Sequence, residues 1–492
     1  MRRQQNDKTT RIYACKTTSG MIYYCPNAEK SMIKRKIESR LESFFEDGGR
    51  YALLIDGARQ VGKTFAIENF AKTHYENVIE INFIKTANAK LIFSNVEDEK
   101  EILVKLSTFS RRELKRGKTL VFLDEIQECP EAVTYIKFLV QDGTCHYILS
   151  GSMLGVELKD IRSVPVGFMD EATMYPLDFE EFVLANGERK ELIDAARMAW
   201  TNRSPIDPLY HDRLSKLFRL YLVVGGMPAV VQRYLDTHDI AAVVAGQKSI
   251  LAEYRKDITK YDKKNALRIR EVFDRIAPEL NKKNKRFYVN SVRETDRAER
   301  LEDEFIWLKE AGVAIPSYVV DEPVAPLVLS RRANLFKLFM NDVGLLAATY
   351  MDGIQLRILN SEIDVNFGAV YENVVAQELL AHGFAPSYYA SRTHGEVDFI
   401  VEKEGRALPI EVKSGKHYRR HRALNHVMAE RLYAIDDAVV FNDSVLAVVD
   451  GIFYAPIYMM MFLEKPRLPG KLIYDVGAPL QSFPPARDPR AE

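Results

Sequence analysis

Short apolar runs alternate with helical stretches in the first part of the chain, after an amphipathic helix expected at about residues 33–45. Each run is four to six residues long, and the four runs lie at residues 51–56, 78–83, 119–124 and 146–149. Buried strands of this length that alternate with helices are typical of a parallel α/β sheet. The pattern therefore predicts an α/β domain over residues 32–205.

Helical stretches replace the strands after about residue 206. One long helix is expected at residues 241–261, and residues 265–320 show the order helix, Lys-rich turn, helix and β-like tail. That order suits a winged-helix unit, and it also fits any small helical subdomain. We therefore expect a helical, winged-helix-like region over residues 206–325.

A second α/β segment is expected at residues 326–480, where a helix precedes short strands around 397–401 and 408–412. The two ends of the chain differ from the rest in composition. Residues 1–31 are polar and aperiodic, which predicts a disordered tail. Residues 481–492 are rich in proline and charge, which predicts a frayed tail.

Composition and charge exclude several kinds of protein. Lys plus Arg number 69 and Asp plus Glu number 69, so no global charge draws the chain to nucleic acid or membrane. No apolar run approaches the ~20 residues of a membrane helix, and residues 1–31 have no apolar signal-peptide core. We therefore expect a cytoplasmic protein without membrane contact. The cysteines form no CxxC pair and indicate reduced thiols rather than a zinc site; they are Cys15, Cys25, Cys129 and Cys145.

A phosphate-binding loop (P-loop) is predicted between the first apolar run and the following helix. Residues 57–64 read GARQVGKT and match the GxxxxGK(S/T) pattern without a mismatch. Its glycines let backbone N–H groups curl around phosphates, and the helix N-terminus adds partial positive charge. Lys63 is predicted to reach the β- and γ-phosphates and Thr64 to bind Mg²⁺, so the predicted cofactors are ATP and Mg²⁺. The nucleotide-contacting candidates are Gly57, Ala58, Arg59, Gln60, Val61, Gly62, Lys63 and Thr64.

Two further strands carry candidate residues at their carboxyl ends, where ligands bind in open parallel sheets. Asp124 ends one strand and is expected to hold Mg²⁺, while Glu125 beside it is expected to polarise the attacking water as the catalytic residue. Ser150 and Ser152 follow the next strand, and either hydroxyl could sense the γ-phosphate. Ser152 suits a helix N-cap almost equally well.

The sequence identifies no arginine finger, the arginine that completes many ATPase sites. Arg59 lies inside the loop, Arg162 follows the sensor strand, and Arg255 lies on a helix that could face a neighbouring molecule. Each is more often an ordinary surface arginine. The oligomeric state therefore stays open.

Four charged residues in the last segment predict a second site. Glu372 lies on the expected helix, Asp398 enters a strand, and Glu411 and Lys413 share one face of the next strand because strand side chains alternate. Three carboxylates as ligands and Lys413 as the catalytic cation suit a Mg²⁺ site for phosphodiester cleavage. An isolated Glu-x-Lys would more simply be an ion pair on a solvated face, and the neighbouring motifs favour the metal site.

Basic residues near this site make DNA a candidate partner. One group directly follows Glu411 and the other lies in the expected winged-helix turn; they are Lys413, Lys416, Arg419, Arg420 and Arg422, and Lys282, Lys283, Lys285 and Arg286. Both groups could contact phosphates, although a charge run is more often a solvated face. His417 and His421 stand four apart on an expected helix and, without a third ligand, are assigned to the same basic face.

From about Met32 onward, the chain resembles bacterial and archaeal ATPases that join an AAA-type P-loop domain to a C-terminal domain of unknown function. The resemblance rests on the P-loop and on motifs that are highly specific in combination. They are LDEIQ at 123–127, LSGS at 149–152, YPLDFEEF at 175–182, GGMP at 225–228, YRKDI at 254–258, NDVGLL at 341–346, EVDF at 396–399 and EVKSG at 411–415.

This resemblance implies an AAA-type sheet with the sensor strand between the two motif strands, a winged-helix-like middle and a C-terminal fold similar to PD-(D/E)XK nucleases. It places nuclease-like ligands on Glu372, Asp398, Glu411 and Lys413, and nucleotide contacts on the P-loop, Asp124 and Glu125. One position departs from the family. After Pro165-Val166-Gly167 such proteins often carry a basic residue, where this chain has Phe168, which argues against a phosphate-contacting cation from that loop.

Three functions fit these observations. The leading hypothesis is a DNA-acting ATPase in which ATP binding and hydrolysis control a C-terminal nuclease or DNA-binding module. The second is a nucleotide-dependent regulatory switch whose C-terminal domain is an inactive nuclease fold that binds a protein partner. The third is an ATP-dependent remodeller of proteins. Glu125 favours hydrolysis over a site that only binds nucleotide.

Overall fold

A computed structural model describes residues 33–152, 167–261, 265–282, 285, 287, 302–350, 353–362, 367–415, 418–443 and 446–466. Several residues named above lie outside these ranges. They are the two expected tails, Cys15, Cys25, Arg162, Pro165, Val166, Lys283, Arg286, Lys416 and His417.

The first domain contains a five-stranded sheet, all of whose paired strands are parallel. Its order is β2-β3-β4-β1-β5, and the bounds are β1 Ala52–Asp56, β2 Asn77–Asn82, β3 Thr119–Asp124, β4 His146–Ser150 and β5 Met169–Thr173. The sensor strand β4 lies between β3 and β1, so the expected order of these three strands is confirmed. The register pairs Asn82 with Asp124 and Asp124 with Ser150, which aligns these three residues along the carboxyl edge of the sheet.

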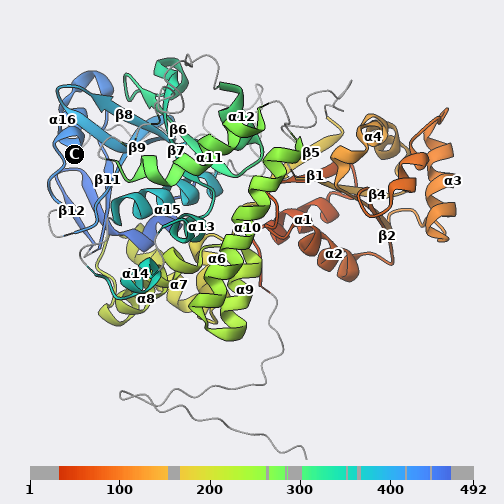
Figure 1. The fold of residues 1–492 in the computed structure, drawn as a ribbon, viewed down its shortest axis with the longest axis horizontal. Coiled ribbons are helices and arrows are strands. Elements are labelled where there is room, and N and C mark those ends of the chain that lie inside the picture. Colours follow the sequence, from red (N-terminus) through yellow and green to blue (C-terminus); the bar gives the residue numbers. More distant parts are fainter. Residues whose placement is uncertain are drawn as a thin grey trace, which may run out of the picture.

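Helices cover both faces of this sheet, as Figure 1 shows for the red-to-orange part of the chain. Alternate residues of each strand point to opposite faces. Leu54, Val121 and Leu149 pack with the α3 and α4 side, whereas Leu53 and Ile148 pack with the α1 and α2 side. The helices are α1 Ile37–Glu46, α2 Lys63–His74, α3 Glu99–Ser110 and α4 Pro130–Asp142. Burial on both faces explains why the inner strands are continuous apolar runs.

A helical region follows, and its longest helix runs between the two sheets of the molecule (Figure 1). That helix is α10, Ile240–Tyr261. The other helices are α6 Phe179–Ala185, α7 Lys190–Thr201, α8 Pro208–Val224, α9 Pro228–Thr237, α11 Ala266–Leu280 and α12 Glu302–Glu310. Among the described residues, no single helix is long and apolar enough to cross a membrane, although the bent pair α8 and α9 passes that test by length and composition.

The second sheet has eight strands in the order β12-β13-β11-β10-β9-β8-β6-β7. Their bounds are β6 Ala314–Val320, β7 Arg331–Met340, β8 Ser387–Ser391, β9 Gly395–Lys403, β10 Arg406–Val412, β11 Ala438–Asn442, β12 Ala447–Val449 and β13 Ile452–Pro456. β8, β9 and β10 pair antiparallel, whereas β10, β11 and β13 pair parallel. β6, expected as the tail of a winged-helix unit, instead pairs with β7 and β8 in this sheet.

Two helices sandwich the central strands of the second sheet. α15, Phe367–Ala381, packs on one face through the core that also holds α8 and α10, and α16, Arg422–Ala429, packs on the other. The short helices α13, Val343–Ala348, and α14, Ile354–Leu359, pack against α8. One apolar core runs from Leu177 to Leu463, so the helical region and the second sheet are not separately packed units.

Candidate functional site

The P-loop joins β1 to α2, as predicted, and its glycines occupy positions that exclude side chains. Gly57 has φ +140°, and a Cβ there would lie 2.1 Å from the carbonyl oxygen of Met174. Gly62 has φ +94° and directly precedes α2. Both conformations are strained for residues with a Cβ. The motif is therefore required by the local backbone as well as by phosphate chemistry.

Lys63 lies buried inside the loop that it belongs to. Its Nζ donates to the carbonyl oxygens of Gly57 at 2.7 Å and Ala58 at 2.9 Å. Burial lowers the pKa of Lys63 to about 8, although the carboxylates of Asp56, Glu125 and Asp124 oppose this shift. The ammonium group is thus held at the P-loop, where an added phosphate would replace carbonyl contacts and favour the charged form.

Oxygen ligands suited to Mg²⁺ meet at the carboxyl edge of the sheet. Thr64 Oγ1 lies 3.2 Å from Asp124 Oδ2, and Ser150 Oγ donates to Asp124 Oδ1. Asn82, which the sequence analysis missed, donates from Nδ2 to Asp124 Oδ2 at 2.8 Å. A hydroxyl beside a buried carboxylate is a donor set that Mg²⁺ prefers, so these residues fit the ion. Ser150 thus contacts Asp124 directly, and its role as a phosphate sensor stays a prediction.

Glu125 has a strained backbone and a fixed side chain. Its φ of +54° lies in the left-handed region, which non-glycine residues rarely adopt. Gln127 Nε2 donates to Glu125 Oε2 at 2.6 Å, and Ser152 Oγ donates to the same oxygen at 3.1 Å. Strain of this kind persists where the surroundings over-determine it, often at functional sites. Ser152 therefore contacts the carboxylate, and the residues that an N-cap serine would bond lie outside the described part of the chain.

Helix α10 covers the P-loop from the helical region. Asp257 Oδ1 accepts from Arg59 Nη1 at 2.7 Å, and Tyr254 OH lies 3.4 Å from the carbonyl oxygen of Arg59. Arg255, one of the finger candidates, instead pairs with Asp274. Arg59 and Asp257 are 198 positions apart in the sequence, so only the folding of the chain brings α10 to the P-loop. In the sequence, the YRKDI motif marked this part of α10, but nothing in it predicted a contact with the P-loop.

Phe168, the position that departs from the family, lies at the start of the edge strand. It is half-buried against the α3 and α4 side of the core, with Lys137 Nζ 5.4 Å from its ring centre.

The C-terminal candidates also come together. Lys413 Nζ lies 2.6 Å from Glu411 Oε2, which confirms that the two side chains lie on one side of β10. Asp398, on the adjacent strand β9, accepts from the backbone N–H of Val412 at 2.9 Å. Burial and the neighbouring Asp398 raise the pKa of Glu411, whereas Lys413 opposes that shift.

Two lysines that the sequence analysis did not assign to this site hold Glu372. Lys337 Nζ on β7 lies 3.5 Å from Glu372 Oε2 and 2.6 Å from Glu396 Oε1. Lys285 pairs with Glu372 Oε1. Although burial lowers the pKa of Lys337, Glu372 and Glu396 raise it above its usual value, so its ammonium stays charged.

The residues of the two candidate metal sites differ in how well they suit Mg²⁺. Among the described residues, no group of three or more His, Cys, Asp or Glu side chains is placed to hold a metal ion. Glu372 faces two ammonium groups, and Glu411 faces a third. Glu372, Asp398 and Glu411 thus form a cluster with three lysines. Lys413 belongs to the predicted Mg²⁺ site, whereas Lys285 and Lys337 occupy both oxygens of Glu372, so Glu372 does not suit a metal ligand in this arrangement.

The residues of the basic group beyond β10 differ in exposure. Arg419, Arg420 and Arg422 are exposed at the turn between β10 and α16. His421 is buried, with Nε2 2.7 Å from Tyr454 OH, so it is not part of a basic face. The expected helix that would carry His421 begins only at Arg422. Lys282, in the other group, pairs with Glu279 at 2.7 Å.

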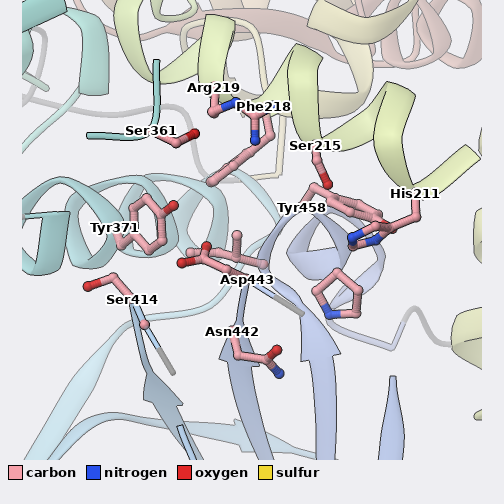
Figure 2. Close-up of a pocket in the computed structure, with 13 residues that line it drawn as sticks. His211, Ser215, Phe218, Arg219, Ser361, Tyr371, Ser414, Asn442, Asp443 and Tyr458 are labelled. Atoms are coloured by element: carbon pink, nitrogen blue, oxygen red, sulfur yellow. The ribbon is translucent and has the colours of Figure 1, made fainter. Parts of the chain in front are cut away.

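A cavity of ≈ 250 Å³ lies beside the C-terminal cluster, between α8 and the carboxyl ends of β10, β11 and β13. Figure 2 shows His211, Ser215 and Arg219 on the helix side, with Ser414 and Asp443 on the strand side. His211 Nδ1 is already hydrogen-bonded to Tyr458 OH at 2.9 Å. Burial raises the pKa of Asp443, although a hydrogen bond from Tyr371 and the charge of Arg219 lower it.

Three family models match this chain. Residues 49–183 match the AAA domain, residues 215–356 match a domain of unknown function (DUF8612), and residues 367–458 match another (DUF4143). The first match and the strand order show that the chain carries an AAA-type P-loop ATPase domain. No curated protein matches.

Solved structures show distant similarity. A Walker-type ATPase of Pyrococcus abyssi is 16% identical with a TM-score of 0.42, over 66% of this chain and 97% of that one. The RuvB Holliday junction branch migration motor of Thermotoga maritima is 14% identical with a TM-score of 0.29, over 59% of this chain and 92% of that one. The Orc1 protein of Aeropyrum pernix, solved with DNA, is 12% identical with a TM-score of 0.26, over 68% and 97%.

Proposed function

We propose that this protein hydrolyses ATP with Mg²⁺ at the P-loop. The observation that carries the proposal is Glu125, a carboxylate fixed by Gln127 and Ser152 next to the Asp124–Thr64 pair. A site that only bound nucleotide would have no need of a second, separately oriented carboxylate. Strained, doubly hydrogen-bonded residues of this kind suit a group that must meet one water molecule in one direction.

Each residue has a distinct role in this proposal. Backbone N–H groups of the P-loop and the start of α2 hold the phosphates, and Lys63 offsets their charge. Thr64 and Asp124 would hold the Mg²⁺ ion, which neutralises charge on the phosphates when bound. Both donors to Glu125 among the described residues bond Oε2, which leaves Oε1 to accept a proton from the attacking water.

ATP turnover by Glu125→Gln tests this function. The amide keeps the shape of the side chain but cannot take a proton, so we expect kcat to fall by about 10²–10⁴-fold while nucleotide binding persists. Glu128→Gln is the matched control, because Glu128 lies three residues further on and pairs with Lys90 instead. Turnover by Glu125→Gln at the wild-type rate would remove Glu125 from the reaction.

For the C-terminal part, we propose a fold similar to PD-(D/E)XK nucleases that binds DNA without cutting it. The fold proposal is supported by the order α15, β8, β9, β10, α16, β11 and by the meeting of Asp398, Glu411 and Lys413. The lysines around Glu372 and Glu411 argue against cleavage through a bound metal. Exposed Arg419, Arg420 and Arg422 beside this cluster suit contact with phosphates. A combined binding and cleavage assay separates these roles.

A further inference from the structure

A chain of side-chain contacts connects helix α10 to the proposed catalytic carboxylate. It runs from Asp257 through Arg59 and Ser152 to Glu125. We infer that Arg59 and Asp257 are positioning residues that orient Glu125, so that the rate of ATP hydrolysis depends on how α10 is seated on the P-loop. This inference rests on the proposed ATP hydrolysis and adds residues and a control element to it.

The first link fixes the Arg59 guanidinium. Its Nη1 lies 2.7 Å from Asp257 Oδ1, and its Nε lies 3.3 Å from Ser152 Oγ. A guanidinium is planar and carries donors on several edges, so it can bond both partners at once in one fixed plane. Asp257 is itself a buried residue of α10, which limits the positions that its carboxylate can adopt.

The second link sets the direction of the Ser152 proton. Arg59 can only donate, so Ser152 Oγ must accept from it. The single hydroxyl proton of Ser152 is then directed to its other partner, Glu125 Oε2, 3.1 Å away. Without Arg59 in place, the hydroxyl could rotate and Glu125 would lose one of its two orienting donors. The pair therefore controls the carboxylate from a distance, without touching the reacting atoms.

The seat of α10 is in turn tied to the C-terminal part of the chain. Tyr254 OH on α10 lies 3.4 Å from Arg59 O and accepts from Asn341 Nδ2 at 3.3 Å. The next residue, Asp342, accepts from the backbone N–H of Gly226 at 2.6 Å. The GGMP, YRKDI and NDVGLL motifs thus meet in one cluster that ends at the P-loop. A change of the C-terminal part that moved α10 would reach Glu125 by this route.

Steady-state ATP kinetics of Asp257→Asn test the inference. We expect kcat to fall by about 10- to 100-fold, because displacement of a reacting group by about 1 Å has effects of this size. KM for ATP is expected to stay within about 2-fold, because the phosphate-holding backbone is unchanged. Asp257→Glu, which keeps the carboxylate, should recover part of kcat. Asp274→Asn is the control. Asp274 lies on α11 and pairs with Arg255, which is on α10 like Asp257 but does not contact the P-loop in this pair.

A second variant keeps the test independent of how well Asp257→Asn folds. Ser152→Ala should lower kcat by a similar factor. The double variant, with Asp257→Asn and Ser152→Ala together, should be no slower than either single variant, because both changes break the same series of side-chain contacts. Additive losses, a rise in KM alone, or wild-type kinetics in both single variants would overturn the inference while leaving ATP hydrolysis intact. No ATP hydrolysis by the wild type would overturn the proposed function and the inference together.

Discussion

Lys337 carries a positive charge in the interior of the second sheet, where no part of the residue is exposed to solvent. Removing an ammonium from water costs several kcal/mol, and only close partners with good geometry recover that cost. Lys337 has Glu396 and Glu372 on one side and the ring of Tyr388 at 5.0 Å. The ammonium group of Lys337 therefore lies beside Glu372, for which the sequence predicted a bound metal ion instead.

Replacing Lys337 with methionine should destabilise the C-terminal core by about 3–5 kcal/mol, because Glu372 and Glu396 would keep their charge without this partner. Urea unfolding followed by tryptophan fluorescence measures this, since Trp200 and Trp307 both pack in the core shared by α8 and the second sheet. Lys309→Met is the control, because Lys309 is half-exposed and pairs with its own neighbour, Glu310. Equal stability of Lys337→Met and wild type would show that the buried pair is not structural.

Sequence reasoning identified residues whose chemistry is local and missed those placed by the fold. Gly57, Lys63 and Asp124 could be predicted because a motif of eight residues and one strand end carry all the necessary information. Lys337 could not, because a lysine within a strand is nearly always exposed. Asp257 could not, because its meeting with Arg59 depends on the packing of the whole helical region.

At the scale of elements, the GGMP segment shows how a breaker in the sequence becomes a junction in the structure. It joins α8 to α9, and Gly226 there donates its N–H to Asp342, which also accepts from Leu345 N at the start of α13. Burial raises the pKa of Asp342 to about 6, although these backbone donors oppose the shift. The carboxylate of Asp342 thus connects three helices, and a Cβ at Gly225 would lie 2.3 Å from its Oδ1, so a residue with a side chain could not occupy that position without a shift.

Gly226→Ala should destabilise the protein by about 1–3 kcal/mol, because an added Cβ would lie 2.1 Å from the carbonyl oxygen of Leu177 and force the backbone to shift. Gly246→Ala is the matched control. Gly246 lies within α10, where the nearest atom to a new Cβ is Arg233 Nη1 at 3.4 Å, so we expect a gain of about 0.5–1 kcal/mol. Thermal unfolding of both variants measures the two signs, and a stabilised Gly226→Ala would contradict this account of the junction.

The strands show the same division between local and distant information. The run at 119–124 coincides with β3, and the other inner strands differ from their predicted bounds by one residue. β5, Met169–Thr173, was missed because this edge strand is largely exposed and has no apolar pattern. The partners of β6 could not be predicted because strand pairing depends on residues far along the chain.

At the scale of the whole molecule, the ATPase domain and the C-terminal part are connected through contacts at the P-loop itself. α10 lies between them (Figure 1), and the turn at Gly312, just before β6, approaches Ala58 so closely that a Cβ would lie 3.1 Å from its backbone nitrogen. A nucleotide at the P-loop would therefore lie next to elements that continue into the second sheet. This arrangement suits an ATPase whose nucleotide state affects the C-terminal part of the chain.

The last prediction separates DNA binding from DNA cleavage. With Mg²⁺ or Mn²⁺, we expect linear, branched and single-stranded DNA to be bound but not cut by the wild type, because lysines face Glu372 and Glu411. We expect the same of Lys413→Ala, because Lys285 and Lys337 still face Glu372 in that variant. Replacing Arg419, Arg420 and Arg422 together with alanine should weaken binding and reduce the salt slope by about 1 for each phosphate that the variant no longer neutralises. Electrophoretic mobility shifts at several salt concentrations, with cleavage products resolved on denaturing gels, measure both properties.

The same assay needs a control for net charge, and the exposed cluster Lys115, Arg116 and Lys118 on the ATPase domain supplies one. Alanine at those three positions removes as much charge as the triple arginine variant, so equal weakening of DNA binding by both would mean that no specific DNA surface lies at the β10–α16 turn.

Cleavage by the wild type that is abolished in Lys413→Ala would show that the C-terminal part is an active nuclease. Asp398 and Glu411 would then have to bind metal with the lysines displaced, and the protein would be an ATP-coupled nuclease. If DNA is neither bound nor cut while ATP is hydrolysed, the DNA-binding proposal is wrong, and the alternative of a protein partner for the C-terminal part is favoured.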